Sequence, residues 1–182
     1  MLDEARARLD RFGDRVTFQQ SDLGRELAPE LRAGSLDAVF STGTFHWVID
    51  HPGLYRQLFA LLAPGGCLVA QCGGEGSISE VRGILDHLGI DWSSLNRYAA
   101  ASETVTWLRQ AGFVDAWAWL SKEPVGFHGR EALVDYLVGG ALGPYLAGRP
   151  DEDQRAVTET VADRMAEPVL HFVRLNVLAR RP

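Results

Sequence analysis

Short apolar runs alternate along this chain with segments whose apolar residues recur every three to four positions. The runs are typical of strands buried in a sheet, and the helical spacing is typical of helices that pack one face against it. The pattern predicts strands over residues 15–20, 36–41, 67–72, 113–120 and 169–179. It predicts helices over residues 2–12, 52–62, 78–88, 102–111, 130–138 and 151–165. Strands that alternate with helices predict an α/β fold, an open and mostly parallel sheet with helices on both faces.

Ligands of such sheets bind beyond the carboxyl ends of the strands. That rule singles out residues 22–23, 41–47 and 71–76. The last segment contains Gly73-Gly74-Glu75-Gly76, which is similar to a loop that holds phosphate through backbone N–H groups. The dinucleotide fingerprint would need a glycine where Ser79 stands, so an ordinary loop is favoured. The sequence also lacks a Gly-x-Ser-x-Gly elbow, which argues against a serine hydrolase.

Composition narrows the class of protein further. A hydrophobic fraction of 46 % and a charged fraction of 23 % are ordinary for a folded domain. A formal net charge of −6 argues against a binder of nucleic acid or of an anionic membrane. Cys67 and Cys72 lie five apart on a predicted strand and are expected on opposite faces, which fits a reducing, cytoplasmic setting. Four histidines show no metal-ligand spacing with Asp, Glu or Cys, so no metal site is predicted. They are His51, His87, His128 and His171.

One long stretch carries a family resemblance. Residues 36–48 read LDAVFSTGTFHWV, Asp50 and a predicted helix follow, and residues 62–68 read LAPGGCL. This arrangement resembles the class I S-adenosylmethionine (SAM) dependent methyltransferases, and most of all their trans-aconitate 2-methyltransferase-like branch. Residues 172–181 are similar to the last strand of that branch. The resemblance implies a Rossmann-like sheet flanked by helices, with an antiparallel final strand and a small helical cap. Residues 76–101 and 123–168 would form the lid or cap segments.

The resemblance also implies what stands before the first residue. The opening MLDEA is similar to the helix that follows the family's second strand. The family's glycine-rich turn, and the acid that holds the ribose, belong to the first two strands and have no counterpart here. We therefore expect an N-terminally truncated piece of a longer parent, missing its first two strands. The strand over residues 15–20 should then lose its usual partner or pair with residues 36–41, and these 182 residues alone should bind SAM weakly or not at all.

Site residues follow from the resemblance one by one. Asp22 would accept a hydrogen bond from the adenine amino group, and the backbone N–H of Leu23 would meet the ring. The small residues Ser41, Thr42 and Gly43 would let the backbone approach the methionine part of SAM. Trp47 would form a wall of the methyl pocket, and His46 would act as a base or orient the acceptor. The alternatives are a turn-forming aspartate, an ordinary strand-to-helix loop and plain aromatic packing.

The acceptor side is expected in the cap segments. Four aromatic residues there would enclose an acceptor or simply pack the cap on the sheet: Trp92, Tyr98, Tyr136 and Tyr145. Arg174 stands on an otherwise apolar strand, where it would clamp a carboxylate or form a structural ion pair. The sequence thus predicts methyl transfer from SAM to a small-molecule acceptor such as a carboxylic acid. The alternative is a non-catalytic, methyltransferase-like partner subunit. It would expose apolar sheet and would either form a homodimer or bind another partner.

Overall fold

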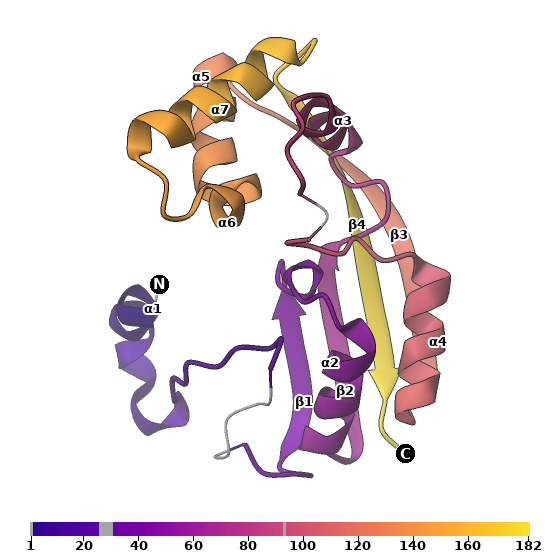
Figure 1. Ribbon diagram of the computed structural model, residues 1–182. Helices are drawn as coiled ribbons and strands as arrows, with labels where there is room; N and C mark the ends of the chain where they lie inside the picture. The colour runs from indigo at the N-terminus through magenta and orange to yellow at the C-terminus, as the bar shows by residue number, and fades with distance from the viewer. Residues whose placement is uncertain (1, 26–30, 93) are drawn as a thin grey trace.

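A four-stranded sheet forms the centre of the molecule (Figure 1). The computed structural model describes residues 2–25, 31–92 and 94–182. Its strands are β1 (Leu36–Thr42), β2 (Leu62–Gly73), β3 (Val114–Gly126) and β4 (Val169–Arg180), in the order β1-β2-β4-β3. β1 and β2 are parallel, whereas β4 is antiparallel to both β2 and β3. The expected antiparallel final strand is confirmed. The expectation of a mostly parallel sheet is wrong, because β4 lies between β2 and β3 and opposes both.

Seven α-helices and three short helical turns are found in the described part of the chain. The helices are α1 (Leu2–Leu9), α2 (His51–Leu61), α3 (Ser79–His87), α4 (Ala101–Ala111), α5 (Arg130–Tyr136), α6 (Gly143–Leu146) and α7 (Asp151–Arg164). The turns are η1 (Asp10–Arg15), η2 (Phe45–Trp47) and η3 (Leu137–Ala141). Asp50 begins α2, because its side chain accepts a hydrogen bond from the N–H of Gly53 at 2.9 Å. Gly112 ends α4 in the left-handed conformation, with φ of 105°.

Two hydrophobic clusters hold these elements together. The sheet core lies between the inner face of the sheet and helices α2 and α4. The cap core lies among α3, η3 and α5 to α7, and it reaches the first half of β4. β4 contributes to both, with Leu170 in the cap core and Leu175 and Val177 in the sheet core. The chain therefore has one continuous strand that passes from one core to the other.

The outer face of the sheet is open. Phe40, Val69, Leu178 and Trp117 stand opposite one another in register across all four strands. Phe40 is 76 % exposed and Trp117 is 65 % exposed. The prediction of helices on both faces is therefore wrong for the described residues, because α2 and α4 pack on the same face. α1 has no buried residue and stands apart from the sheet in Figure 1.

The strand predicted over residues 15–20 is not formed. Residues 16–22 have no regular secondary structure, and β1 pairs with β2 alone among the described strands. Two outcomes were expected for this segment: loss of its usual sheet partner, or pairing with residues 36–41. The first is confirmed, and the second is wrong. Alternating apolar residues specify a strand only where a neighbour can take its backbone hydrogen bonds.

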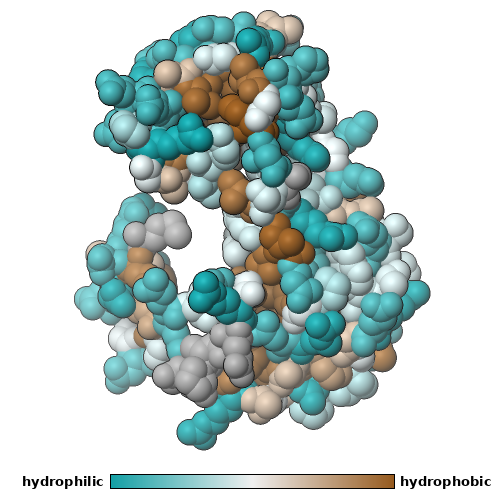
Figure 2. Space-filling model, in the orientation of Figure 1, coloured by the Kyte–Doolittle hydropathy of each residue, from teal (hydrophilic) through white to brown (hydrophobic). Residues whose placement is uncertain are grey.

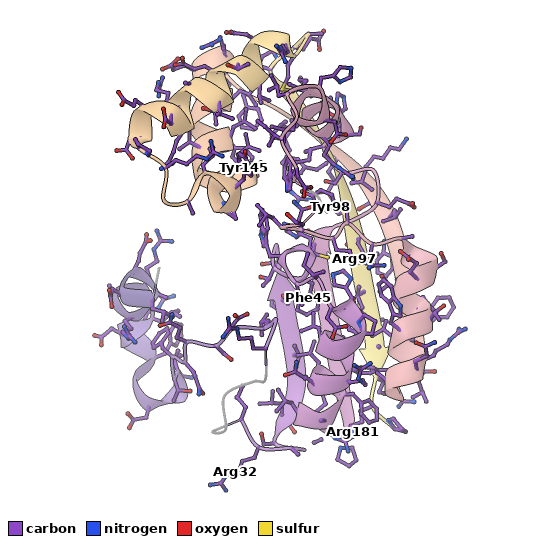
Figure 3. The ribbon with its side chains drawn as sticks, viewed as in Figure 1. Arg32, Phe45, Arg97, Tyr98, Tyr145 and Arg181 are labelled. Atoms are coloured by element: carbon purple, nitrogen blue, oxygen red, sulfur yellow. The ribbon has the colours of Figure 1, made fainter. Side chains whose placement is uncertain are left out.

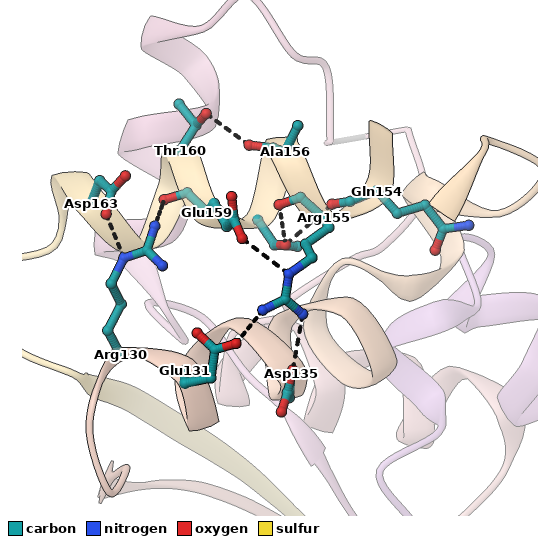
Figure 4. Close-up of polar contacts among 10 residues, drawn as sticks. Arg130, Glu131, Asp135, Gln154, Arg155, Ala156, Glu159, Thr160 and Asp163 are labelled. Atoms are coloured by element: carbon teal, nitrogen blue, oxygen red, sulfur yellow. Dashed lines mark hydrogen bonds and ion pairs between the residues drawn. The ribbon is translucent and has the colours of Figure 1, made fainter. Parts of the chain in front are cut away.

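Charged side chains join α5 and α7 on the outside of the cap core (Figure 4). Arg155 of α7 contacts Glu131 and Asp135 of α5, and its Nε lies 3.0 Å from Glu159 on its own helix. Arg130 and Asp163 form a further pair between the same helices. Exposed pairs of this kind contribute little each, so packing in the cap core holds the helices together. In the parts of the chain that are described, no helix has both the length and the apolarity to cross a membrane.

Candidate functional site

A cavity of about 190 Å³ lies between the sheet and the cap. The carboxyl ends of the parallel strands β1 and β2 open into it, as the strand-end rule predicts. Six of the predicted site residues line it: Gly43, His46, Trp47, Tyr98, Tyr136 and Arg174. Figure 2 shows apolar residues gathered on the cap and along its junction with the sheet. Figure 3 places Tyr98 at this junction.

Two glycines shape the floor of the cavity. Gly43 follows β1 with φ of 64°, a conformation that residues with a Cβ rarely adopt. Its N–H donates to the carbonyl of Gln71 at 2.8 Å, which fixes the turn against β2. Gly73 ends β2 directly beneath Tyr98, and a Cβ built on it would lie 2.4 Å from Cε1 of that ring. The backbone conformation therefore favours glycine at position 43, and the lack of space beneath Tyr98 requires it at position 73.

His46 is held as a neutral imidazole. Its Nδ1 accepts a hydrogen bond from the N–H of Gly73 at 3.2 Å, and its ring stacks on Tyr98 with centroids 5.5 Å apart. Burial lowers the pKa of His46 to about 4, and the positive charge of Arg174 acts in the same direction. Because Nδ1 is an acceptor, the proton of the neutral ring is on Nε2. Such a ring donates one hydrogen bond and has no free lone pair with which to act as a base.

This geometry predicts that the protein loses stability in acid. The unfolded state binds a proton at His46 below pH 6.5, whereas the folded state does so only near pH 4. Burial lowers the pKa of His51 as well. The free energy of unfolding should therefore fall as pH drops from 6.5 toward 4, by at most about 1.4 kcal/mol per pH unit for each histidine. Urea denaturation at pH 7.5 and pH 5 would measure this, and His46→Gln should reduce the difference. An equal difference in both proteins would show that His46 does not contribute.

Arg174 combines the two predicted alternatives. Its Nε lies 3.3 Å from Glu123, so a structural ion pair is present. The same guanidinium group lies over the ring of Phe172 at 4.5 Å, and the side chain lines the cavity with 26 % of its surface exposed. One carboxylate leaves part of the guanidinium fork available, because arginine carries five N–H donors. The cavity therefore contains one cationic side chain from β4.

The remaining predicted residues lie outside this cavity. Asp22 accepts a hydrogen bond from the N–H of Gly24 at 2.9 Å and pairs with Arg25, which is the turn-forming alternative. Leu23 packs against the sheet core, and Trp92 is buried in the cap core. Ser41 and Thr42 end β1 without lining the cavity, and Tyr145 accepts a hydrogen bond from Arg149 at 2.9 Å.

Sequence reasoning singled out the loop over residues 71–76 but missed Ile78 as a residue of the cavity. Ile78 lines the cavity with φ of 43°, an unusual conformation for a β-branched residue. Its N–H donates to the carbonyl of His171 at 2.9 Å, so β4 holds it in place. The N–H groups of Gly74 and Glu75 donate to backbone carbonyls as well, and they are not available to hold a phosphate. The sequence signalled a loop here but not its contacts with β4.

Comparison with known proteins identifies the family. A family described as a methyltransferase domain matches residues 1–70. Trans-aconitate 2-methyltransferase of Methylobacterium nodulans is 30 % identical over 200 residues, covering all of this chain and 74 % of the relative. The chain belongs to the class I SAM-dependent methyltransferase family. The enzyme of the same name from Klebsiella pneumoniae is 28 % identical over 162 residues, which cover 82 % of this chain and 63 % of the relative's length.

Solved structures show the same fold as this methyltransferase domain. The YcgJ protein of Bacillus subtilis has a TM-score of 0.65 at 15 % identity, covering all of this chain and 78 % of that one. Phosphoethanolamine N-methyltransferase 2 of Haemonchus contortus, solved with S-adenosylhomocysteine, has a TM-score of 0.56 at 19 % identity. The match covers all of this chain and 41 % of the length of the Haemonchus protein. The Rossmann-like methyltransferase fold is thus established for the chain, with the mixed sheet described above.

Proposed function

We propose that the full-length methyltransferase transfers a methyl group from SAM to a small carboxylic acid held in the cavity. The observation that carries the proposal is Arg174, a partly buried cation that faces His46 and Tyr98 across the strand ends. The planar fork of arginine suits a carboxylate. The relatives from Methylobacterium nodulans and Klebsiella pneumoniae support the proposal, because their name gives a carboxylic acid as the acceptor.

The cavity suits one end of the cofactor. Gly43 presents backbone without a side chain there, and Trp47 provides an aromatic wall. At about 190 Å³ the cavity is smaller than the roughly 300–1,000 Å³ of a typical ligand pocket. Asp22, proposed for the adenine, makes its contacts within its own turn. The described residues therefore fit the methionine end of SAM, whereas they do not gather a site for its nucleoside end.

Placement is what these side chains would contribute to the reaction. When bound, SAM supplies a methyl group already activated on sulfonium. A carboxylate acceptor is ionised at neutral pH and needs no base, which agrees with the neutral His46. Arg174 would hold the acceptor, the Nε2–H of His46 would orient it, and Tyr98 and Tyr136 would exclude water. Holding two reactants in line accounts for roughly 7–11 kcal/mol of a barrier.

Steady-state kinetics of the full-length protein would test the role of Arg174. Arg174→Gln should raise KM for a carboxylate acceptor on the order of tenfold to a hundredfold, because one charged hydrogen bond contributes about 1.5–3 kcal/mol. KM for SAM should change much less. Arg56→Gln, on the exposed side of α2, is the matched control with the same loss of charge. An unchanged KM for the acceptor in Arg174→Gln would rule out the proposed contact.

Calorimetry would test the cofactor affinity of these 182 residues. We expect weak SAM binding or none, because the described residues form only part of a cofactor site. Micromolar binding would contradict this expectation, and it would mean that the nucleoside is held by residues that the cavity does not include.

The open outer face favours the second candidate, a partner subunit that forms a homodimer. Phe40, Val69, Leu178 and Trp117 form an exposed apolar row, and β1 has a free edge among the described strands. Light scattering after size-exclusion chromatography should then give the mass of a dimer. The double variant Phe40→Ser/Trp117→Ser should return the mass to 20.0 kDa. A monomeric wild-type protein would contradict the homodimeric partner subunit, and it would leave the proposal of methyl transfer unaffected.

A further inference from the structure

A second cavity, of about 260 Å³, lies beside the first and shares Tyr98 with it. Besides Tyr98 its walls are Arg82, Trp92, Asn96, Arg97 and Glu103. Figure 3 labels Arg97 and Tyr98 together at the junction of sheet and cap. These side chains come from α3, from the segment that follows it, and from α4. The proposed methyl transfer uses none of the walls except Tyr98.

Asn96 is the feature that points to a ligand. The residue is only 7 % exposed, and its Nδ2 has no hydrogen-bond partner among the described residues. A buried donor without a partner costs about 1–3 kcal/mol, so native proteins rarely leave one unsatisfied. Nδ2 of Asn96 has almost no exposed surface in this structure, so the side chain must turn toward the cavity before its amide can offer its two N–H donors to a group that enters there. A ligand that accepts hydrogen bonds would remove the cost.

The charges around Asn96 select the kind of ligand. Arg97 lies 3.2 Å from Glu103 and over the ring of Trp107 at 4.8 Å, and these contacts fix its guanidinium group. Arg82 lies 6.0 Å from the centre of the Tyr98 ring, and none of the ion pairs among the described residues includes it. Two guanidinium groups against one carboxylate leave one net positive charge beside the unpaired amide. Guanidinium groups match the geometry of carboxylate and phosphate oxygens.

We infer that this second cavity binds a small oxyanion, a carboxylate or a phosphate, through Arg82, Arg97 and the amide of Asn96. The ligand satisfies the Nδ2 donor and balances the positive charge, while Trp92 and Tyr98 form the side walls. Tyr98 also stacks on His46, so the bound anion sits next to the ring that separates the two cavities. The inference does not depend on methyl transfer, and it holds for a catalytic or a non-catalytic protein.

Nuclear magnetic resonance of the 182-residue protein tests the site directly. Inorganic phosphate and succinate are titrated separately, and the side-chain amide resonances of Asn96 are followed. We expect saturable shifts with at least one anion, and the anion that binds more tightly identifies the source. Arg82→Gln should weaken binding on the order of tenfold, which equals about 1.4 kcal/mol. Arg56→Gln removes the same charge from an exposed residue of α2 that does not line the cavity, and it should leave the dissociation constant unchanged.

Two outcomes would overturn the inference. One is the absence of any Asn96 shift with either anion. The other is equal weakening by Arg82→Gln and Arg56→Gln, which would show attraction by overall charge alone. Asn96→Ala should also abolish binding, and Arg82→Gln keeps the test valid if that variant does not fold, because Arg82 is exposed. Arg174→Gln should leave phosphate binding unchanged, which separates this site from the first cavity.

Discussion

Replacing Gly73 with alanine is expected to destabilise the protein by about 1–3 kcal/mol, the usual cost of overpacking a filled site. The new Cβ would lie 2.4 Å and 2.8 Å from two carbons of the Tyr98 ring. That ring cannot simply swing away, because it stacks on His46 and is largely buried. Urea denaturation would measure the loss. The proposed acceptor site should be damaged at the same time, since Gly73, His46 and Tyr98 line one cavity.

Gly83 provides the matched control. It lies inside α3, and a Cβ built there would meet nothing within 4 Å. Gly83→Ala should therefore stabilise the protein by up to about 1 kcal/mol, the difference in helix propensity between the two residues. In a Tyr98→Ala background the cost of Gly73→Ala should largely disappear, because the clashing ring is gone. A cost that persists in that background would place the strain elsewhere.

The second large effect is expected on β4. Leu170 and Leu175 are both fully buried on this strand, the first in the cap core and the second in the sheet core. Leu170→Ala and Leu175→Ala should each cost about 2–5 kcal/mol, as large-to-small changes in a core do. Leu178→Ala is the control on the same strand, and it should cost much less because Leu178 is 43 % exposed on the outer face.

Hydrogen exchange would show whether the two cores unfold together. Because β4 is continuous, we expect Leu170→Ala to lower the protection of α5 and α7 first, and Leu175→Ala to lower protection throughout. β4 pairs with β2 and β3, and Leu175 packs in the sheet core beneath this pairing. Loss of the Leu175 side chain should therefore weaken both pairings of β4. Unchanged protection of the sheet and the cap in Leu175→Ala would contradict a supporting role for this strand.

The elements with the clearest local patterns were predictable. The apolar runs at β1 and β2 and the Leu-rich face of α2 have neighbours close in sequence, and they lie where the pattern placed them. The resemblance also brought His46, Trp47 and Arg174 to one cavity. β3 and β4 were recognised as strands, but their pairing was not, because the choice of neighbour depends on contacts distant in sequence.

Other features had no signal in a single sequence. The exposure of Phe40 depends on whether anything covers the outer face, and residues 15–20 needed a partner strand that β1 does not supply. Ile78 has a positive φ, against the preference of a β-branched residue, at a point where its N–H donates to the carbonyl of His171 on β4. Asn96 reads as an ordinary loop residue until its surroundings are known.

The chain leaves the sheet at the end of β3, forms helices α5 to α7, and returns at the start of β4. Its points of exit and return are neighbours, because Gly126 and Val169 are paired. A chain segment whose two ends are neighbours can be exchanged for another without altering the register of the strands it leaves. Residues 127–168 are thus a natural cassette for engineering. Grafting the corresponding segment of another methyltransferase between these two positions would exchange Tyr136, Gly140 and Ala141, which line the first cavity. Gly43, His46 and Trp47 would stay as they are.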